Sequence, residues 1–342
     1  MATVIGGEFK IPLAGIETKE SDNGIFFASG RGAFAAILRK IIVDKNAMHE
    51  WGGERVILPD YLCSSITQVC IDEKISYQFY HIKDDLLPDE EDLLTKLENN
   101  TVVLLISYFG MINVENIANR IKKHNSNVVI IMDDVQNFYS QYSESNFWDY
   151  RFNSYRKWFA VPDGAQVFCK SGSIDLPHAK NTFAQYKFSG NVLKNFSEWV
   201  EDSLCLDLLG KGEEILDTDY NCECSKISRH LIPQLPFEEI KSKRMENASF
   251  LHDELEKLGI KHTYNPESVP LFIPVFLENR SEVRKKMFSN NIFTPVHWPY
   301  ESNKLNGTIK NPLYETEISL ICDQRYSLED MKRQIEVLEK CI

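Results

Sequence analysis

A lysine and a pair of aspartates are the residues of this chain best suited to covalent chemistry. Lys157 lies among bulky aromatic residues and precedes a Pro-Asp-Gly turn. Apolar surroundings lower the pKa of an amine, and such an amine attacks carbonyl carbons to form a Schiff base. Upstream, Asp133 and Asp134 follow the apolar run 128–132. We expect them at the carboxyl edge of a sheet, where open α/β sheets bind ligands. The alternative for the lysine segment is an aromatic loop that carries surface cations.

A helix expected at 31–43 supplies a third component, an anion site. It follows the turn Ala28-Ser29-Gly30, and the unpaired N–H groups and the dipole of a helix start attract anions. A helix start, a Schiff-base lysine and a strand-end carboxylate are together what pyridoxal 5'-phosphate needs. They would hold its phosphate, its aldehyde and its protonated pyridine nitrogen, respectively.

Alternating apolar runs and helical patterns in the first half predict a sheet covered by helices on both faces. The expected strands are 55–58, 77–80, 101–107, 127–132 and 165–169. The expected helices, besides 31–43, are 64–73, 90–98 and 114–124. This order is typical of a mostly parallel sheet.

A change of texture between Pro233 and Pro236 marks a second, smaller domain. We therefore expect a large cofactor-binding domain at 1–235, with a short N-terminal arm at 1–24, and a small C-terminal domain at 236–342. In the small domain, helices are expected at 237–258, 281–289 and 327–342, and strands at 271–276 and 318–321. Ser327 and the acidic residues after it predict an N-cap for the last helix.

Composition excludes several classes of protein. The chain has 342 residues, 43% of them hydrophobic, and a net charge of 38 − 50 = −12. That balance does not suit a phosphate-tracking surface, so we expect neither nucleic acid nor an anionic membrane as a partner. No apolar run approaches the length of about 18 residues that spans a bilayer. The N-terminus does not resemble a secretory signal, so we expect a cytoplasmic protein.

The cysteines form no C-x-x-C pair, which favours reduced thiols over disulfides. Cys222 and Cys224, with His230 nearby, are a weak candidate for zinc. A structural zinc site needs four ligands at finger-like spacing, so we expect no metal site here.

Several segments, taken in order, resemble the DegT/DnrJ/EryC1/StrS aminotransferases. They are SGRGA at 29–33, LPDYLC at 58–63, D-x-x-Q at 133–136, S-x-x-K at 154–157 and TPVHW at 294–298. The resemblance runs from about residue 25 to the end of the chain. It implies an α/β fold like that of aspartate aminotransferase, the pyridoxal-phosphate fold type I. This fold has a mostly parallel seven-stranded sheet and a small C-terminal α/β domain, and the enzymes are homodimers.

The resemblance also implies a reaction and the residues that perform it. Lys157 would form the internal aldimine and move the proton, Asp133 would pair with the pyridinium, and Gln136 would bond the ring hydroxyl. Glutamate would be the amino donor. The acceptor would be a keto group of a nucleotide-linked sugar, so the expected partners of the protein are these small molecules and a second copy of the chain.

The phosphate would be held by the backbone of Arg31 and Gly32 and by the hydroxyl of Ser154. Ser154 lies three residues before the lysine, whereas the family's serine lies five before it. Cys63 stands where many members place the aromatic ring that stacks on the cofactor, and Tyr61 and Tyr108 are candidate replacements by proximity.

Two further residues are candidates for substrate binding. The resemblance puts His297 near the substrate mouth, although a hydrogen-bonded turn residue is the alternative. Arg325 is a candidate carboxylate clamp, because a guanidinium binds carboxylates through two bonds, or else a salt-bridge residue before the last helix.

Two other functions stay open at this stage. One is sugar dehydration, but the family's dehydratases replace the lysine by histidine, so Lys157 favours transamination. The other is a non-catalytic sensor or scaffold, which the departures at Cys63 and Ser154 leave open.

Overall fold

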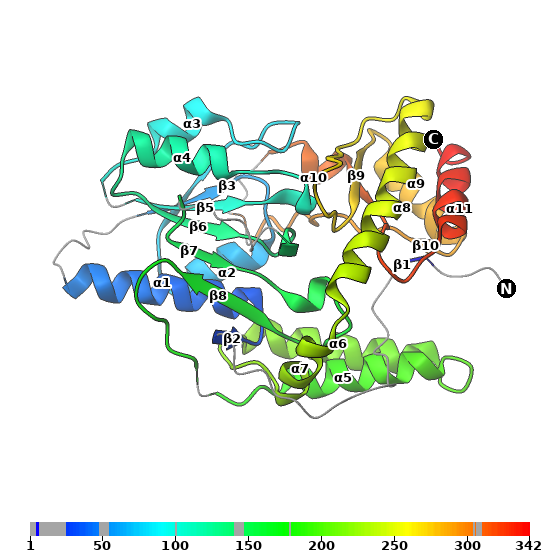
Figure 1. Ribbon diagram of the computed structural model, residues 1–342, viewed down its shortest axis with the longest axis horizontal. Coiled ribbons are helices and arrows are strands. Elements are labelled where there is room, and N and C mark those ends of the chain that lie inside the picture. Colours follow the sequence, from blue (N-terminus) through cyan, green and yellow to red (C-terminus); the bar gives the residue numbers. More distant parts are fainter. Residues whose placement is uncertain are drawn as a thin grey trace.

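The structure of the protein is a computed structural model. It describes residues 5–6, 25–47, 55–99, 101–139, 147–177, 179–303, 305 and 310–342 (Figure 1). The expected N-terminal arm, apart from 5–6, lies outside these residues.

A seven-stranded sheet forms the centre of the first part of the chain, in the order β2-β8-β7-β6-β5-β3-β4. Strands β3 to β7 are parallel, whereas β8 runs antiparallel to its neighbours β2 and β7. This confirms the predicted fold class. The strands are β2 (Ile25–Phe27), β3 (Val56–Pro59), β4 (Tyr77–Tyr80), β5 (Val102–Ile106), β6 (Val129–Asp133), β7 (Tyr150–Phe152) and β8 (Ala165–Cys169).

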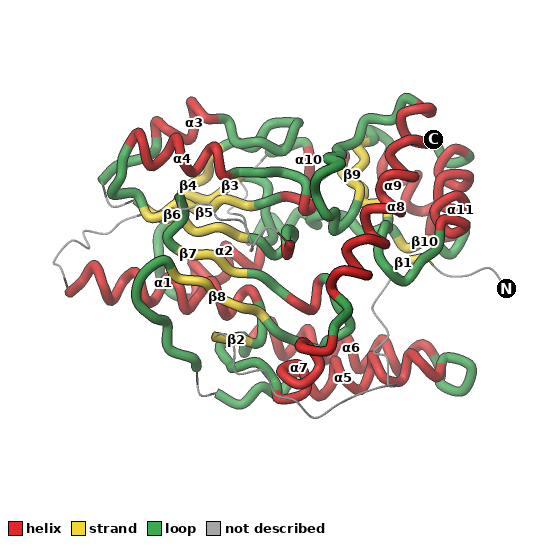
Figure 2. Tube along the Cα trace, in the orientation of Figure 1, coloured by secondary structure: helices red, strands yellow, loops and turns green. Residues whose placement is uncertain are grey.

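The central strands are apolar on both sides because helices cover both faces of the sheet. All five residues of β5 are buried, as are the last four of β6. Figure 2 shows α3 and α4 on one face and α1 and α2 on the other. The helices of this part are α1 (Gly30–Ala47), α2 (Ser64–Asp72), α3 (Glu90–Thr95), α4 (Glu115–His124), α5 (Phe183–Leu193), α6 (Asp202–Thr218) and α7 (Lys226–Leu231). Such continuous apolar strands are typical of a buried parallel sheet.

The C-terminal elements form a smaller layer beside the carboxyl edge of the sheet (Figure 1). Two small sheets lie here, antiparallel β9–β11 and parallel β1–β10. The predicted cap of α11 is confirmed, since the Ser327 and Asp330 side chains form a capping box. The elements are α8 (Phe237–Leu258), β9 (Ile273–Phe276), α9 (Arg280–Ser289), β10 (Ile292–Phe293), α10 (Leu313–Thr316), β11 (Glu317–Leu320), α11 (Leu328–Glu339) and the N-terminal β1 (Ile5–Gly6).

The sequence patterns missed the helical pair α5 and α6. These helices pack closely because glycines face the partner helix. A Cβ added at Gly190 would lie 2.8 Å from Cγ of Leu209, and one at Gly212 would lie 2.8 Å from Cδ of Lys187. Among the described helices, none combines the length and the apolar character needed to cross a membrane.

Candidate active site

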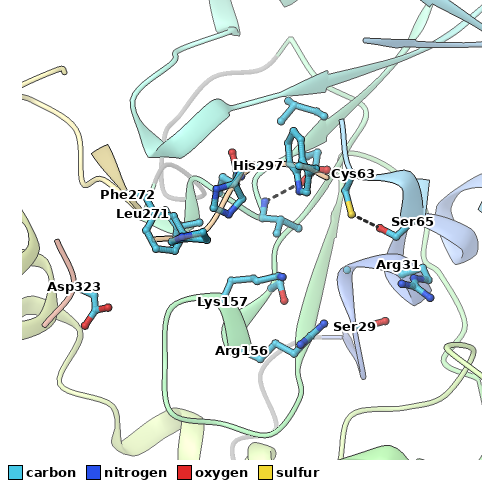
Figure 3. Close-up of a pocket in the computed structure, with 18 of the residues that line it drawn as sticks. Ser29, Arg31, Cys63, Ser65, Arg156, Lys157, Leu271, Phe272, His297 and Asp323 are labelled. Carbon is cyan, nitrogen blue, oxygen red and sulfur yellow. Dashed lines mark hydrogen bonds between the residues drawn. The ribbon is translucent and has the colours of Figure 1, made fainter. Parts of the chain in front are cut away.

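A cavity of about 570 Å³ lies between the carboxyl edge of the sheet and the C-terminal elements. Figure 3 shows Lys157 in the middle of its lining, with Ser29 and Arg31 to one side and Asp323 to the other. Of the residues predicted for the site, those that line the cavity are Arg31, Cys63, Asp133, Gln136, Ser154, Lys157, His297 and Arg325. Gly32 and Tyr108 do not line it.

The backbone around Lys157 is held firmly while its side chain reaches the cavity. Lys157 ends the short 3-10 turn Tyr155–Lys157, which follows β7. The N–H of Tyr155 donates to the carbonyl of Gly164 at 2.9 Å, and the indole N–H of the buried Trp158 donates to the carbonyl of Val135 at 2.9 Å. The predicted aromatic loop therefore anchors the lysine, because the neighbouring rings are core residues.

Asp133 is a buried carboxyl group at the end of β6. Burial raises the pKa of Asp133 to about 7, and the negative charge of Asp134 adds to this shift. Two groups oppose the shift. They are the N–H of Val135, which donates to Oδ1 at 2.9 Å, and the cation of Lys157. Asp134 instead pairs with Arg151 at 2.7 Å and accepts from the Ser107 hydroxyl at 3.0 Å. Of these two aspartates, Asp133 is thus the one available to a cation in the cavity.

The N-terminus of α1 lies at the cavity. Ser29, Gly30 and Arg31 line the cavity, whereas the N–H of Gly32 donates to Oγ of Ser29 at 3.1 Å. This N–H is thus paired with the side chain of Ser29 at the helix start, and its role with a phosphate stays a prediction. The absence of a side chain at Gly32 serves packing, because a Cβ would lie 2.5 Å from the carbonyl oxygen of Tyr220.

The Arg31 side chain is bound to α6. Its Nη2 pairs with Asp217 at 2.8 Å, and its Nη1 donates to the carbonyl of Leu216 at 3.2 Å. The guanidinium also lies 5.7 Å from the ring centroid of Tyr220. Its backbone N–H is therefore the group of Arg31 that suits an anion at the helix start.

An ion cluster beside Lys157 was not predicted. Glu213 of α6 lies 2.7 Å from Nη1 of Arg156 and 2.7 Å from Nζ of Lys187. Burial alone would raise the pKa of Glu213, but the two cations hold it well below its usual range. The sequence analysis did not single out Glu213, because α6 itself was not predicted.

Tyr108 does not supply an aromatic ring to the wall of the cavity. Tyr108 is 1% exposed, and its hydroxyl donates to the carbonyl of Tyr61. Its ring packs behind Trp298, which does line the cavity. Cys63 also lines it, and its Sγ accepts from the hydroxyl of Ser65 at 3.1 Å. Tertiary packing directs the Tyr108 side chain into the core, so its ring contact with the cofactor stays a prediction.

Gln136 presents its amide nitrogen as the free end of the side chain. The amide oxygen Oε1 accepts from the backbone N–H of Phe109 at 2.9 Å, and the residue is 4% exposed. A Gln136 with its oxygen occupied acts on a ligand as a hydrogen-bond donor.

His297 is the outer member of a buried hydrogen-bond chain. Its Nδ1 lies 2.8 Å from Oγ of Ser319, and Ser319 donates to Oε1 of Glu317 at 2.6 Å. Oε2 of Glu317 accepts from the His297 backbone N–H at 2.5 Å. Because the serine proton goes to the carboxylate, Nδ1 of the ring must carry the proton that Ser319 accepts. In the neutral ring, Nε2 is then the acceptor.

Arg325 already holds a carboxylate of its own chain. Its Nε and Nη2 pair with Asp323 at 2.8 and 2.6 Å. Burial would raise the pKa of Asp323, but Arg325 keeps it below its usual value. Arg325 lines the cavity, and Asp323 occupies the edge of its guanidinium that Nε and Nη2 form.

The lining is basic even though the whole chain is acidic. The basic side chains of the lining, leaving out the imidazole, are Arg31, Arg156, Lys157, Arg244, Arg284 and Arg325. The carboxyl groups of the lining are those of Asp133, Glu213 and Asp323. An excess of cations in a partly enclosed site favours anionic ligands.

These groups fit pyridoxal phosphate. The cavity brings together the amine of Lys157, the buried carboxyl of Asp133, the donor amide of Gln136 and the start of α1. Asp133 has a raised pKa because burial is only partly offset, and a cationic ring nitrogen would compensate for that burial.

Several solved structures that share the fold of this chain are sugar aminotransferases. No family model matches the chain, and no curated protein matches its sequence. The structure is similar to the PLP form of Spr1654 from Streptococcus pneumoniae, which is described as a candidate sugar aminotransferase. The two chains are 15% identical, the match covers 93% of this chain and 87% of that chain, and the TM-score is 0.67. It is also similar to PseC from Helicobacter pylori, an aminotransferase of pseudoaminic acid biosynthesis, at 15% identity, 92% and 85% coverage and a TM-score of 0.66. A DegT DnrJ EryC1 StrS aminotransferase from Brucella abortus matches at 15% identity, 92% and 85% coverage and a TM-score of 0.59. The resemblance seen in the sequence is thus confirmed at the level of the fold.

Proposed function

We propose that this protein is a pyridoxal-phosphate-dependent aminotransferase that transfers an amino group from glutamate to a keto group of a nucleotide-linked sugar. The observation that carries the proposal is the meeting of Lys157, Asp133 and the start of α1 in one cavity. The fold shared with sugar aminotransferases supports it.

Each residue has a role that follows from its surroundings. The cofactor, when bound, supplies an electron sink that stabilises negative charge at the substrate carbon. Lys157 holds the cofactor and moves the proton through its amine, and Asp133, as a carboxylate, pairs with the ring nitrogen. Gln136 donates its amide N–H to the ring hydroxyl. The N–H of Arg31 and the hydroxyl of Ser154 bind the phosphate.

The charge of the lining supports anionic substrates. Arg284 lies at the cavity with Phe288, and its guanidinium is 4.4 Å from the ring centroid. A cation beside an apolar ring suits a nucleotide, which has a phosphate and a flat base. His297 orients the sugar, because its Nε2 accepts a hydrogen bond from a hydroxyl.

A homodimer is part of this proposal. Large apolar side chains near the junction of α5 and α6 are exposed, Trp199 at 88% and Leu206 at 59%. Large exposed apolar side chains within one short segment of the chain support an interface with another chain.

The first test is the absorption spectrum of the protein with pyridoxal phosphate, before and after glutamate. We expect a band of lysine-bound cofactor in the wild type, and glutamate should convert it to the pyridoxamine form. Lys157→Ala should remove the lysine-bound band, whereas Lys180→Ala, an exposed lysine outside the cavity, should keep it.

The outcomes separate the alternatives. Cofactor binding without conversion by any amino donor would favour a sensor or scaffold. A lysine-bound band that survives Lys157→Ala would remove the assignment of this residue.

A further inference from the structure

A cluster of two histidines and a glutamate lies at the C-terminal end of α8, and none of the three lines the catalytic cavity. The residues are His252, Glu256 and His262. One potential ligand atom from each lies within 4.8 Å of the others. Among the described residues, this is the group whose ligand atoms converge in this way.

Local sequence brings the cluster together. His252 and Glu256 are four residues apart on α8, so they share one face of the helix. Gly259 ends the helix with φ 65°, a left-handed conformation that glycine adopts without strain. The chain then reverses, and the N–H of Ile260 donates to the carbonyl of Leu255 at 3.0 Å. His262 is thereby returned to the face that carries the other two residues.

The His262 ring is oriented as a ligand. Its Nδ1 lies 2.8 Å from the carbonyl oxygen of Ile260, which can only accept, so Nδ1 carries the proton and Nε2 presents a lone pair. A backbone carbonyl on the far nitrogen is the usual support of a metal-binding histidine. The His262 side chain is 3% exposed, so its surroundings fix the ring.

The other two ligands face the same nitrogen. Nδ1 of His252 lies 2.8 Å from Nε2 of His262, and Oε1 of Glu256 lies 3.8 Å from it. The His252 ring stacks on Tyr264 at 4.3 Å, which holds its plane. Without a metal this contact is a hydrogen bond in which Nδ1–H of His252 donates to Nε2 of His262. In the other neutral tautomer of His252, which carries its proton on Nε2, both facing nitrogens offer lone pairs to a metal.

We propose that His252, Glu256 and His262 bind a zinc ion. Two imidazoles and a carboxylate, completed by water, are a common ligand set of zinc, and imidazole favours such a transition metal over calcium or magnesium. The ion fastens the end of α8 to the segment that leads into β9. That segment is held beside β9, since the N–H of Phe276 donates to the carbonyl of Lys261 at 2.9 Å.

This site differs from the zinc candidate considered in the sequence. Burial raises the pKa of Cys222 to about 12 and that of Cys224 well above its usual value, so both thiols keep their protons near neutral pH. Zinc binds the thiolate form.

The test is calorimetric titration of tag-free, metal-stripped, full-length protein with zinc chloride, and it does not require the cofactor. We expect one zinc ion per chain and a higher melting temperature with zinc, because the ion binds the folded chain. Binding should be lost in His252→Gln and in His262→Gln. Glu256→Gln, at a side chain that is 66% exposed, should leave the fold intact and weaken binding about tenfold or more.

His230→Gln is the matched control and should bind zinc as the wild type does. Loss of zinc in that control, with retention in the His252 and His262 variants, would overturn the proposal in favour of the cysteine site. Absence of zinc binding by the wild type would overturn it as well. Circular dichroism of each variant without zinc distinguishes a lost ligand from a lost fold.

Discussion

Asp133 and Asp134 are neighbours in the chain, but their carboxyl groups meet opposite environments. Asp134 is neutralised by Arg151, whereas burial raises the pKa of Asp133 to about 7. The usual pKa of an aspartate is about 4. Between that pH and about 7, the folded protein without cofactor keeps a proton on Asp133 that the unfolded chain has released. The contribution of Asp133 to stability is therefore present at low pH and is lost as the pH rises to about 7.

Asp133→Asn tests this charge directly. Urea unfolding of cofactor-free protein compares the free energy of unfolding of the variant with that of the wild type at each pH. From pH 5 to pH 8 this difference should shift in favour of the variant by on the order of a few kcal/mol, because only the wild type must ionise a buried carboxyl group. In the loaded protein, turnover should fall about a hundredfold, equivalent to about 2.7 kcal/mol. Equal relative stability at both pH values would contradict the assignment. Asp134→Asn is the control, since it should destabilise at both.

The chain of Glu317, Ser319 and His297 predicts a change in the second half-reaction. Ser319→Ala should free the imidazole to change tautomer and raise KM for the keto acceptor about tenfold, while the reaction with glutamate stays near the wild-type rate. It should also lower stability by about 1–3 kcal/mol, because the buried Glu317 loses a donor. Half-reactions followed separately by stopped flow check this split, and an equal loss in both would refute the positioning role.

At the scale of elements, the start of α1 depends on a close approach to the segment after α6. Gly32→Ala would place a Cβ 2.5 Å from the carbonyl of Tyr220 and should displace the helix start. We expect cofactor affinity to fall at least about tenfold, measured by fluorescence titration. Gly210→Ala on α6 is the control, since its Cβ meets nothing within 4 Å. That variant should gain up to about 1 kcal/mol of stability and bind the cofactor normally.

At the scale of the whole molecule, Arg244 joins the two parts of the chain. This arginine of α8 is 1% exposed, donates from Nη1 to the carbonyls of Pro270 and Leu271 at 3.1 and 3.0 Å, and lies 4.7 Å from the ring centroid of Trp158. Trp158 directly follows the proposed catalytic lysine. Gln324 makes a second contact of this kind, since its amide N–H donates to the carbonyl of Trp158 at 2.9 Å. The C-terminal elements thus pack through both side chains against the residue that follows the lysine.

Arg244→Met should cost about 3 kcal/mol of unfolding free energy, because buried carbonyls lose their donor. Lys243→Met, at a partly exposed residue paired with Glu246 at 2.6 Å, should cost at most about 1 kcal/mol. Denaturant unfolding of both variants measures the difference. Similar costs for the two would show that the buried carbonyls of Pro270 and Leu271 do not depend on Arg244.

The sequence by itself missed strands β2 and β7. It predicted strands at the positions of β3, β4, β5, β6 and β8 and helices at those of α1 to α4, and it singled out Lys157 and Asp133 as candidate site residues. These depend on local information, namely apolar periodicity, strand ends and short motifs. The helices α5 and α6 were not predicted, because their close packing relies on Gly190 and Gly212, and glycine weakens a helical sequence pattern.

Only the tertiary structure decided which side chains reach the cavity. Tyr108 is turned into the core and Trp298 lines the wall instead, while Glu213 arrives from a helix far along the chain. The direction of a side chain is set by contacts between distant segments, and no local pattern encodes those contacts. The histidine cluster at the end of α8 was likewise not evident from the sequence, because the chain reversal at Gly259 is what places His262 beside His252.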